Sequence, residues 1–381
     1  MSLAPLPPRD AGRAARTARL HRWLVAEALP LWTGAGLAPD GTVWEALSHD
    51  GTPRPDIPRR MRVQARQAHV FARSAGLHGA PETLKPLAET LFRTVMDRGF
   101  DAEGRLCTGF APDGRRLAAD HDLYDLAFVL LAAASLAEAG VEVAEDLDRL
   151  HAALATLKAP AGWYETQARR RPRRQNPHMH LFEAATEAHA ATGSPRWRAI
   201  AEEILELFGT AFLAADGRIL EMFEDDLAQP ALTGQQLEPG HMAEWIWLLH
   251  RNAAAFGRPT GIDPGAIWAA VQARRLPSGL LADTEDPPSD VCRTWPQTEF
   301  LRAALVMAPE GPLPDEALEQ LWRFYLEPVV PGGWVDKLDR RGVPVSEVMP
   351  ASTLYHLAEA VTAWTYPEGT GPDGTGVRPA G

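Results

Sequence analysis

The 381-residue sequence is poor in cysteine and in cationic side chains. Its two cysteines, Cys107 and Cys292, are too few for a disulfide framework or a cysteine-built zinc site, and such sparing use of cysteine is typical of a reducing cytoplasm. The 38 Lys and Arg residues are outnumbered by 50 Asp and Glu residues, which gives a net charge of −12 at pH 7. This acidic balance excludes the broad basic face that binding to nucleic acid or an anionic membrane requires.

Long apolar runs and phosphate-binding loops are also missing. No apolar run approaches membrane-spanning length, and the N-terminus carries four arginines at helical spacing where a secretory signal would be apolar. The chain has neither a Gly-rich phosphate loop nor a His-Glu-x-x-His motif. We therefore expect a cytoplasmic protein that contacts no membrane or nucleic acid and uses no metal or other cofactor. A local basic run, 169–174, fits either a solvated loop or the rim of a sugar site.

Helical periodicity, by contrast, recurs along almost the whole chain. Apolar residues follow the spacing of an amphipathic or buried helix in twelve segments. These are 14–32, 59–72, 82–98, 120–131, 144–157, 177–191, 195–212, 239–251, 264–275, 294–306, 315–326 and 350–364. Pro177 suits the first position of its helix, which makes Asn176 the expected N-cap.

The segments repeat as pairs. Corresponding positions are Gln67, Asp125, Glu183, Glu244, Glu299 and His356, which lie 58, 58, 61, 55 and 57 residues apart. Connectors are short after one helix of each pair and long after the other, and the long ones contain turn residues and short β-like runs. The helices after the long connectors are the more apolar, so we place them inside.

This pattern predicts an all-α (α/α)6 barrel of six inner and six outer helices, with short β-hairpins in the long connectors. We expect one catalytic domain, 12–366, between a flexible N-terminal tail, 1–11, and a flexible, dispensable tail, 367–381. Because the helices already cover one another, the barrel is expected as a monomer or a homodimer.

In such a barrel, the first two turns of the parallel inner helices converge on one cavity. These turns carry Arg66, Tyr124, Asn176, His180, His241, Glu244, Trp295, Glu299, Tyr355 and His356. Imidazoles, carboxylates and aromatic faces suit a polyhydroxylated ligand, because aromatic planes stack on sugar C–H faces and polar groups bind the hydroxyls. The helix dipole disfavours imidazolium, so we expect neutral histidines that take a proton next to a carbonyl.

The chemistry would begin with an open-chain aldose that loses its C2 proton to a histidine, with Arg66 stabilising the enediolate. Return of the proton to C1 gives a ketose, and return to the other face of C2 gives an epimer. A metal site of His180, His241, Glu244 and His356 is an alternative, but its spacing matches no familiar zinc motif.

Together these motifs resemble the N-acylglucosamine 2-epimerase superfamily over about 59–363. The resemblance is carried by Gln64-Ala65-Arg66, Tyr124-Asp125-Leu126-Ala127-Phe128, Asn176-Pro177-His178-Met179-His180, Pro239-Gly240-His241, Trp295-Pro296-Gln297-Thr298-Glu299 and Leu354-Tyr355-His356. It implies the same barrel and metal-independent sugar epimerase or isomerase activity. It also implies that His241 and His356 form the acid/base pair and that Arg66, Asn176, His180 and Glu244 contact the sugar. From their positions, Tyr124, Trp295 and Glu299 are further expected sugar contacts.

Within the superfamily, the stretch before His356 and the Asn-Pro-His-Met-His motif look most like the D-mannose isomerase branch, which interconverts D-mannose and D-fructose. A sugar 2-epimerase acting on N-acylglucosamine or cellobiose is the first alternative. An inverting glycosidase would need two carboxylates, for which Glu183, Glu244 and Glu299 are candidates. A sugar-binding module without activity is the remaining alternative.

Overall fold

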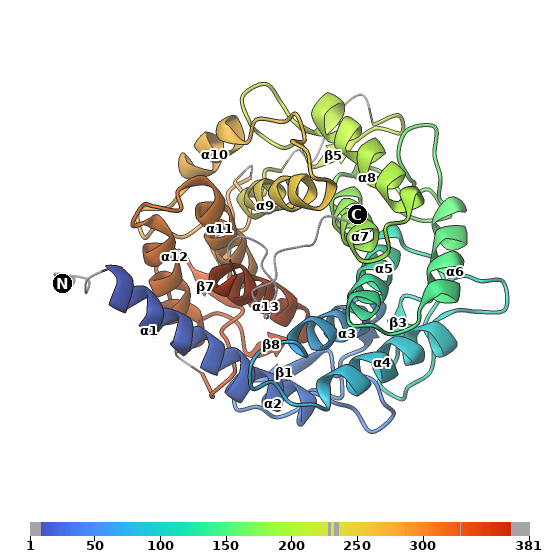
Figure 1. Cartoon of the computed structure of the whole chain (residues 1–381), viewed down its shortest axis with the longest axis horizontal. Helices are drawn as coiled ribbons and strands as arrows, with labels where there is room; N and C mark the ends of the chain where they lie inside the picture. The colour runs from blue at the N-terminus through green and yellow to red at the C-terminus, as the bar shows by residue number, and fades with distance from the viewer. Residues whose placement is uncertain (1–8, 228–229, 232–235, 286, 328, 367–381) are drawn as a thin grey trace.

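Two concentric rings of helices make up the molecule (Figure 1). The structure is a computed structural model that describes residues 9–227, 230–231, 236–285, 287–327 and 329–366. The inner ring consists of α3 (Met61–Ser74), α5 (Leu123–Glu138), α7 (Asn176–Thr192), α9 (Pro239–Phe256), α11 (Thr294–Met307) and α13 (Ala351–Thr365).

The outer ring alternates with the inner ring along the chain. It consists of α1 (Arg9–Arg22), α2 (Leu29–Thr33), α4 (Leu84–Thr94), α6 (Ala144–Ala155), α8 (Pro195–Leu207), α10 (Gly265–Gln272) and α12 (Leu313–Leu321). A π-helical turn, Trp23–Ala28, joins α1 to α2, so these two form one outer helix. The predicted (α/α)6 barrel of six inner and six outer helices is confirmed for the part of the chain that the structure describes.

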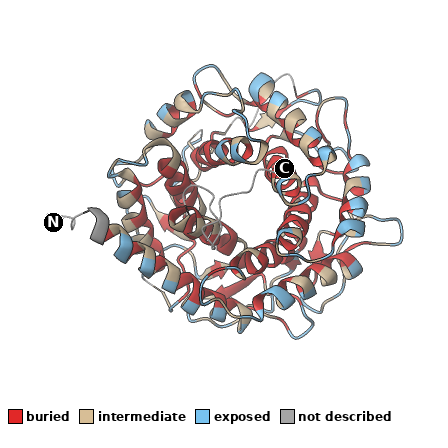
Figure 2. Ribbon diagram, viewed as in Figure 1, coloured by how far each residue is buried: buried red, intermediate tan, exposed pale blue. Residues whose placement is uncertain are grey.

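Burial separates the two rings, as the apolar content of the helices predicted (Figure 2). In α5 every residue from Asp125 to Leu136 is buried, whereas α8 buries only Trp197, Ile200, Ala201 and Ile204. A helix that is apolar on all sides must be enclosed by protein, and one with a single apolar stripe needs a partner on that side only. The inner helices are therefore packed from all sides, and the outer helices form the surface.

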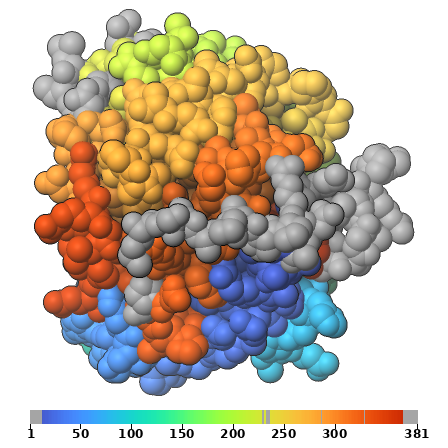
Figure 3. Space-filling model, turned by 90° about the vertical axis from the view of Figure 1, so that its left-hand side faces the viewer, coloured from blue at the N-terminus to red at the C-terminus, as the bar shows by residue number. Residues whose placement is uncertain are grey.

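The ring closes where the two ends of the chain meet. Each inner helix packs on the next, and α13 packs on α3. The N-terminal helix α1 lies beside the α12 region of the chain (Figure 3). Nε of Arg16 and Nη2 of Arg19 each donate to Glu319 of α12 over 2.9 Å. Residues at opposite ends of the sequence thereby complete one barrel.

The long connectors are tied together by short antiparallel strands. The pairs are β1 (Ala46–Ser48) with β8 (Val348–Pro350), β2 (Arg59–Arg60) with β3 (Gly109–Phe110), β4 (Arg173–Arg174) with β5 (Met222–Phe223), and β6 (Val291–Arg293) with β7 (Lys337–Asp339). Each pair joins two different connectors, while single antiparallel bridges such as Leu213 to Ile219 close tight turns inside them. In that turn Gly217 has φ +82°, and a Cβ there would lie 2.2 Å from the carbonyl oxygen of Ala266. Only glycine fits this position.

Each inner helix begins directly after such a strand or connector, so the helix N-termini share one end of the barrel. Asp122 caps α5, because its carboxylate accepts from the backbone N–H of Tyr124 and Asp125. The expected N-cap of α7 was wrong by one residue: the helix already begins at Asn176, and its Oδ1 has no hydrogen-bond partner among the described residues.

The predicted tails meet the described part of the chain only at the N-terminus. Helix α1 begins at Arg9, inside the segment assigned to the N-terminal tail, and the predicted tail 367–381 lies outside the described residues. None of the helices in the described ranges is both long and apolar enough to cross a bilayer.

Candidate active site

A cavity of about 370 Å³ opens at the end of the barrel where the inner helices begin. Its wall includes all but one of the site residues that we expected to bind or transform a sugar: Arg66, Tyr124, Asn176, His180, His241, Glu244, Trp295 and His356. Glu299 is the exception. Its side chain is fully buried behind His356 and does not reach the cavity. The volume lies within the range of small-molecule sites.

Each cavity histidine is held through Nδ1 by a glutamate. The contacts are His180 to Glu183 over 3.1 Å, His241 to Glu221 over 3.0 Å, and His356 to Glu299 over 2.8 Å. A carboxylate at Nδ1 places a proton on that nitrogen and fixes the ring plane. In all three rings Nε2 has no partner among the described residues, which leaves it for a ligand.

His356 and His180 are the neutral imidazoles of this set. Burial lowers the pKa of His356 to about 4, although the hydrogen bond and the charge of Glu299 oppose the shift. Burial, followed by the nearby Arg66 guanidinium, holds the pKa of His180 well below its ordinary value. Both shifts favour the neutral ring, as expected, but their main cause is burial, whereas the sequence had suggested the helix dipole.

His241 differs, and here the expectation of a neutral ring was wrong. Burial by itself would lower the pKa of His241, but Glu238 and Glu221 together raise it well above its ordinary value. Oε2 of Glu238 lies 3.3 Å from Nδ1, on the same nitrogen that contacts Glu221. The two carboxylates outweigh the desolvation and favour the protonated ring.

The indole of Trp295 lies between the two imidazoles of the acid/base pair. Its centroid is 5.1 Å from that of His241 and 5.6 Å from that of His356, with an interplanar angle of 38° in each case. Gly240 makes this possible, because a Cβ there would lie 2.5 Å from the indole. Both imidazoles of the expected acid/base pair thus lie beside one indole.

Arg66 is a buried cation without a carboxylate partner among the described residues. Its Nη2 donates to the hydroxyl of Tyr124 over 2.9 Å, and its guanidinium lies 4.0 Å from the ring centroid of Phe128. Its buried Nε makes no hydrogen bond. A charge this enclosed is costly unless an anion completes its coordination, so Arg66 is placed to stabilise negative charge on a bound ligand.

Two further polar atoms are left open at the cavity. Oε1 of Glu244 and Oδ1 of Asn176 are buried without a hydrogen-bond partner among the described residues. Burial, and then the nearby carboxylates Glu299 and Glu183, raise the pKa of Glu244 well above its ordinary value. A protonated Glu244 is both a donor and an acceptor, which suits a sugar hydroxyl.

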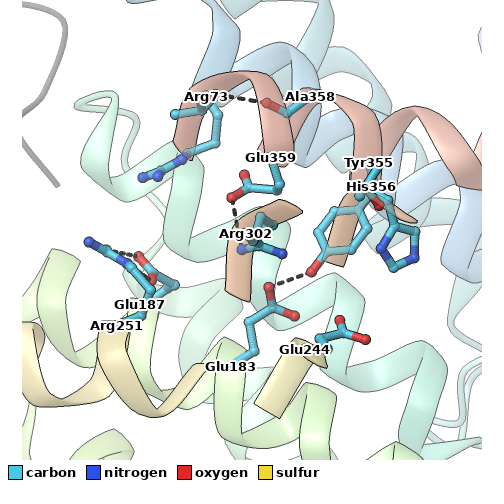
Figure 4. Close-up of polar contacts among 12 residues, drawn as sticks. Arg73, Glu183, Glu187, Glu244, Arg251, Arg302, Tyr355, His356, Ala358 and Glu359 are labelled. Carbon is cyan, nitrogen blue, oxygen red and sulfur yellow. Dashed lines mark hydrogen bonds and ion pairs between the residues drawn. The ribbon is translucent and has the colours of Figure 1, made fainter. Parts of the chain in front are cut away.

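Charged side chains from several inner helices meet beside His356 and Glu244 (Figure 4). Arg302 donates to Glu299 over 2.8 Å and lies 3.5 Å from Glu359, while the hydroxyl of Tyr355 donates to Glu183. Glu299, which holds His356, is thus held by Arg302 of the same helix, and Glu183, which holds His180, is held by Tyr355 of α13. Such a second layer fixes the orientation of the rings above it.

Several residues of the cavity wall were not predicted from the sequence, because they lie in connectors or at the first residues of the helices. They are Arg60, Arg62, Glu238, Arg293, Asp336, Lys337, Pro350, Ser352 and Thr353. The position of Arg62, one helical turn before Arg66, could have revealed that residue. The connector residues carried no comparable signal.

The basic run 169–174 does not line the cavity. Nη2 of Arg173 donates over 2.7 Å to the carbonyl oxygens of Ala161 and Trp163, and Arg174 pairs with Glu165. These contacts connect the loop to the barrel and explain its charge without a ligand.

Among the described residues, three groups have ligand atoms close enough to hold a metal ion. They are His180, Glu183 and Glu244; Glu221, Glu238 and His241; and Glu244, Glu299 and His356. The four residues considered as one metal site do not form a single group. In each group, Nδ1 of the histidine already contacts a glutamate carboxylate. This contact by itself explains why the possible ligand atoms lie close together.

Known proteins resemble this chain in sequence and in fold. The model of the N-acylglucosamine 2-epimerase family matches residues 42–360. The mannose-6-phosphate isomerase of Rhizobium meliloti (strain 1021) is 36% identical over 90% of this chain and 95% of its own length. The D-mannose isomerase of Thermobifida fusca is 32% identical over 89% and 93%. The cellobiose 2-epimerase of Spirochaeta thermophila DSM 6192 superposes with a TM-score of 0.80 at 21% identity, over 93% of this chain and 97% of that one. The chain belongs to the N-acylglucosamine 2-epimerase family, near its mannose isomerase branch, and is a sugar isomerase or epimerase.

Proposed function

We propose that the protein is an aldose–ketose isomerase that interconverts D-mannose and D-fructose without a metal ion. The observation that carries the proposal is the pair of imidazoles at Trp295, with the pKa of His356 lowered and that of His241 raised. Isomerisation needs a base for carbon-bound protons and an acid for the carbonyl oxygen. This pair supplies both at neutral pH.

In the proposed first step, neutral Nε2 of His356 takes the C2 proton of the open-chain aldose. The C2–H electron pair becomes the C1–C2 double bond, and O1 receives a proton from His241. Negative charge that develops on the oxygens is met by Arg66, whose guanidinium has no carboxylate partner among the described residues.

The second step restores both histidines. Neutral His241 takes the proton from O2 as the C2 carbonyl forms, and His356 returns its proton to C1. No electron or proton is lost overall, and the product is the ketose. Glu244, His180 and Asn176 are proposed to bind sugar hydroxyls, since all three line the cavity, and Oε1 of Glu244 and Oδ1 of Asn176 have no hydrogen-bond partner among the described residues.

A sugar 2-epimerase is the second candidate, because His241 is a second imidazole at the same indole face. If His241 protonated C2 from the side opposite His356, the product would be the C2 epimer. A glycosidase has less support, since of its three candidate carboxyl groups only Glu244 lines the cavity.

The test is incubation of the enzyme with mannose in D₂O, followed by NMR of the sugars. Fructose with deuterium at C1 is the expected result. Glucose with deuterium at C2, formed before fructose, would favour the epimerase. A lack of product from mannose, fructose, cellobiose and N-acetylmannosamine would contradict both assignments, and new reducing ends from an oligosaccharide would indicate hydrolysis.

A further inference from the structure

We propose that Glu183 is a neutral carboxylic acid that donates its proton to Nδ1 of His180, so that His180 presents an Nε2–H donor to the sugar. Glu183 is then a positioning residue, because it acts on the substrate only through the imidazole. The role of His180 toward a sugar rests on the proposed function. The protonation of the pair follows from contacts within the protein and is independent of the reaction.

The group at Nδ1 of a neutral imidazole decides which ring nitrogen carries the proton. At His356 this group is Glu299, which also accepts from Arg302 over 2.8 Å. Burial by itself would raise the pKa of Glu299, but Arg302 and the hydrogen bond with His356 hold it below its ordinary value. Glu299 is therefore a carboxylate that accepts from Nδ1–H, and Nε2 of His356 is left without a proton, as a base requires.

Glu183 is buried without such a cation. No Arg or Lys among the described residues lies within ion-pair distance of its carboxyl group. Oε1 accepts from the hydroxyl of Tyr355 (Figure 4). Oε2 lies 3.1 Å from Nδ1 of His180. An enclosed carboxylate without a cation is costly, so such a group keeps its proton.

The surroundings of Glu183 raise its pKa. Burial raises it to about 8, and the charges of Glu359 and Glu187 add to the rise, whereas Tyr355 and Arg302 oppose it. The charged and titratable groups that face Glu183 are Tyr355 and Glu359 of α13, Arg302 of α11, Glu244 and Arg251 of α9, His69 and Arg73 of α3, and His180 and Glu187 of α7.

His180 does not supply the missing positive charge. Burial, followed by the guanidinium of Arg66, holds the pKa of His180 well below its ordinary value. Its ring lies against Tyr124 and Phe128, with centroids 4.9 and 4.6 Å away. The charged and titratable groups that face the ring are Arg62 and Arg66 of α3, Tyr124 of α5, Glu183 of α7, His241 and Glu244 of α9, and Tyr355 and His356 of α13. The ring is therefore neutral and carries one proton.

Hydrogen bonding decides where the two protons of this pair lie. Only one proton fits between Oε2 and Nδ1, which are 3.1 Å apart. If it belonged to Nδ1, the carboxyl proton would lie on Oε1, and the hydroxyl of Tyr355 would lose its one acceptor among the described residues. With the carboxyl proton on Oε2, Tyr355 donates to Oε1, Glu183 donates to Nδ1, and each donor has an acceptor. The proton of His180 is then on Nε2.

This Nε2–H is available to a ligand. His180 lines the cavity, and its Nε2 has no partner among the described residues. As a neutral donor it binds a sugar oxygen without adding a charge beside Arg66. The cavity thus contains two neutral imidazoles of opposite kind, because Nε2 of His356 accepts a proton and Nε2–H of His180 donates a hydrogen bond.

The test is NMR of the protein labelled with ¹⁵N-histidine, since protonated and bare imidazole nitrogens differ widely in chemical shift. His180→Asn and His356→Asn identify the two spin systems by their loss. At pH 7 we expect wild type to carry the proton of His180 on Nε2 and that of His356 on Nδ1. As Glu183 loses its proton near pH 8, its carboxylate should draw the proton of His180 to Nδ1.

Glu183→Gln and Glu299→Gln are a matched pair. In each variant the amide oxygen can accept from the donor that the glutamate binds now, so the NH₂ group faces Nδ1 and keeps a proton on Nε2. For His180 this is the proposed native form, so Glu183→Gln should retain the tautomer and abolish the transition near pH 8. For His356 it removes the base, so Glu299→Gln should lower kcat by about 10² to 10⁴ and Glu183→Gln far less.

Tyr355→Phe removes a hydrogen bond that favours the carboxylate, so the transition of His180 should move to higher pH. Nδ1–H on His180 in wild type at pH 7, a reversed tautomer in Glu183→Gln, or equal losses of kcat in the matched pair would overturn the proposal. The NMR experiment needs no turnover. Nε2–H on His180 in a protein that converts no sugar would therefore support the protonation of Glu183 and contradict the proposed function alone.

Discussion

His241 and His356 have the same side chain and the same kind of Nδ1 contact, but their surroundings favour opposite charge states. Around His241 two carboxylates, Glu221 and Glu238, approach Nδ1. At His356 the carboxylate of Glu299 is shared with Arg302 over 2.8 Å. A cation beside Glu299 offsets part of its attraction for a second proton on His356, so burial prevails there. The second carboxylate beside His241 and the cation beside Glu299 therefore decide which histidine is the proposed acid and which is the proposed base.

The first prediction at this scale concerns the histidines themselves. His241→Asn and His356→Asn should each lower kcat by about 10² to 10⁴, the usual contribution of a general acid or base, while both variants keep the wild-type circular dichroism spectrum. His180→Asn should raise KM more than it lowers kcat, because its proposed role is hydroxyl binding. Retention of wild-type kcat in either of the first two variants would exclude that residue from proton transfer.

The second prediction concerns the charge beside His241. Glu221→Gln removes one of the two carboxylates that raise the pKa of His241, so the imidazolium should lose its proton at a lower pH. The alkaline limb of the kcat/KM profile should therefore move down by about 1 to 3 pH units. Glu224→Gln alters an exposed side chain in the same connector and serves as the control. An unmoved alkaline limb would show that Glu221 does not set the protonation of the acid.

At the scale of helices, the close approach of α9 and α11 forms the aromatic face of the site. Gly240 is the second residue of α9, and Trp295 the second residue of α11. Without a side chain on Gly240, the indole lies directly against the helix that carries His241. In the sequence Pro239-Gly240-His241, packing against the indole thus explains the glycine, and the proposed proton transfer explains the histidine.

Gly240→Ala should therefore displace Trp295. The added Cβ would lie 2.5 Å from the indole, closer than real contacts allow, and a shift of about 1 Å at a reacting site costs on the order of 10²-fold in rate. kcat/KM and near-UV circular dichroism measure the effect. Gly209→Ala, whose Cβ meets only a flexible isoleucine end, is the control. If the indole is the cause, Trp295→Phe should cost less in the Gly240→Ala background than in wild type.

At the scale of the whole molecule, charged side chains from several inner helices meet in the centre of the barrel (Figure 4). Arg302 from α11 bridges Glu299 of the same helix and Glu359 of α13, and Nε2 of His69 from α3 contacts Glu359 over 3.1 Å. Arg302, Glu299 and His69 are buried, and the side chain of Glu359 is 13% exposed. Removal of one partner leaves a buried charge uncompensated, which is far more costly than the loss of a surface pair.

We expect Arg302→Met to lower the free energy of unfolding by about 3 to 5 kcal/mol, because two buried carboxylates lose their cation. Arg258→Met, which breaks a solvent-exposed pair with Glu202, should cost about 1 kcal/mol or less. Urea denaturation of both variants measures the difference. Equal losses would mean that the central network contributes no more than a surface ion pair.

The reaction of the intact enzyme should not require a metal ion. Each cavity imidazole already has a carboxylate partner at Nδ1, and the proposed steps use only protein acids and bases. Exhaustive dialysis against EDTA should leave the rate of mannose turnover unchanged, and added Mg²⁺, Mn²⁺ or Zn²⁺ should not raise it. A loss that one of these ions reverses would assign it to one of the three His/Glu groups.

The amino-acid sequence by itself determined the barrel and about half of the cavity wall. Helical periodicity and the alternation of long and short connectors are local features, so they identify inner and outer helices without knowledge of tertiary contacts. Because the inner helices begin at one end, their first turns place Arg66, Tyr124, His180 and His356 together. Eight of the nine expected site residues line the cavity for this reason.

Only the tertiary structure decided which groups control these residues. Glu221 lies 20 positions before His241 in a connector, and Lys337 meets Arg293 through the pairing of two separate connectors. Such long-range contacts leave no periodic signal in the sequence. Nor does the sequence distinguish Glu299, buried behind His356, from Glu244, which faces the cavity. Charge states depend on burial and on neighbours in space, which is why the imidazolium at His241 emerged only from the folded chain.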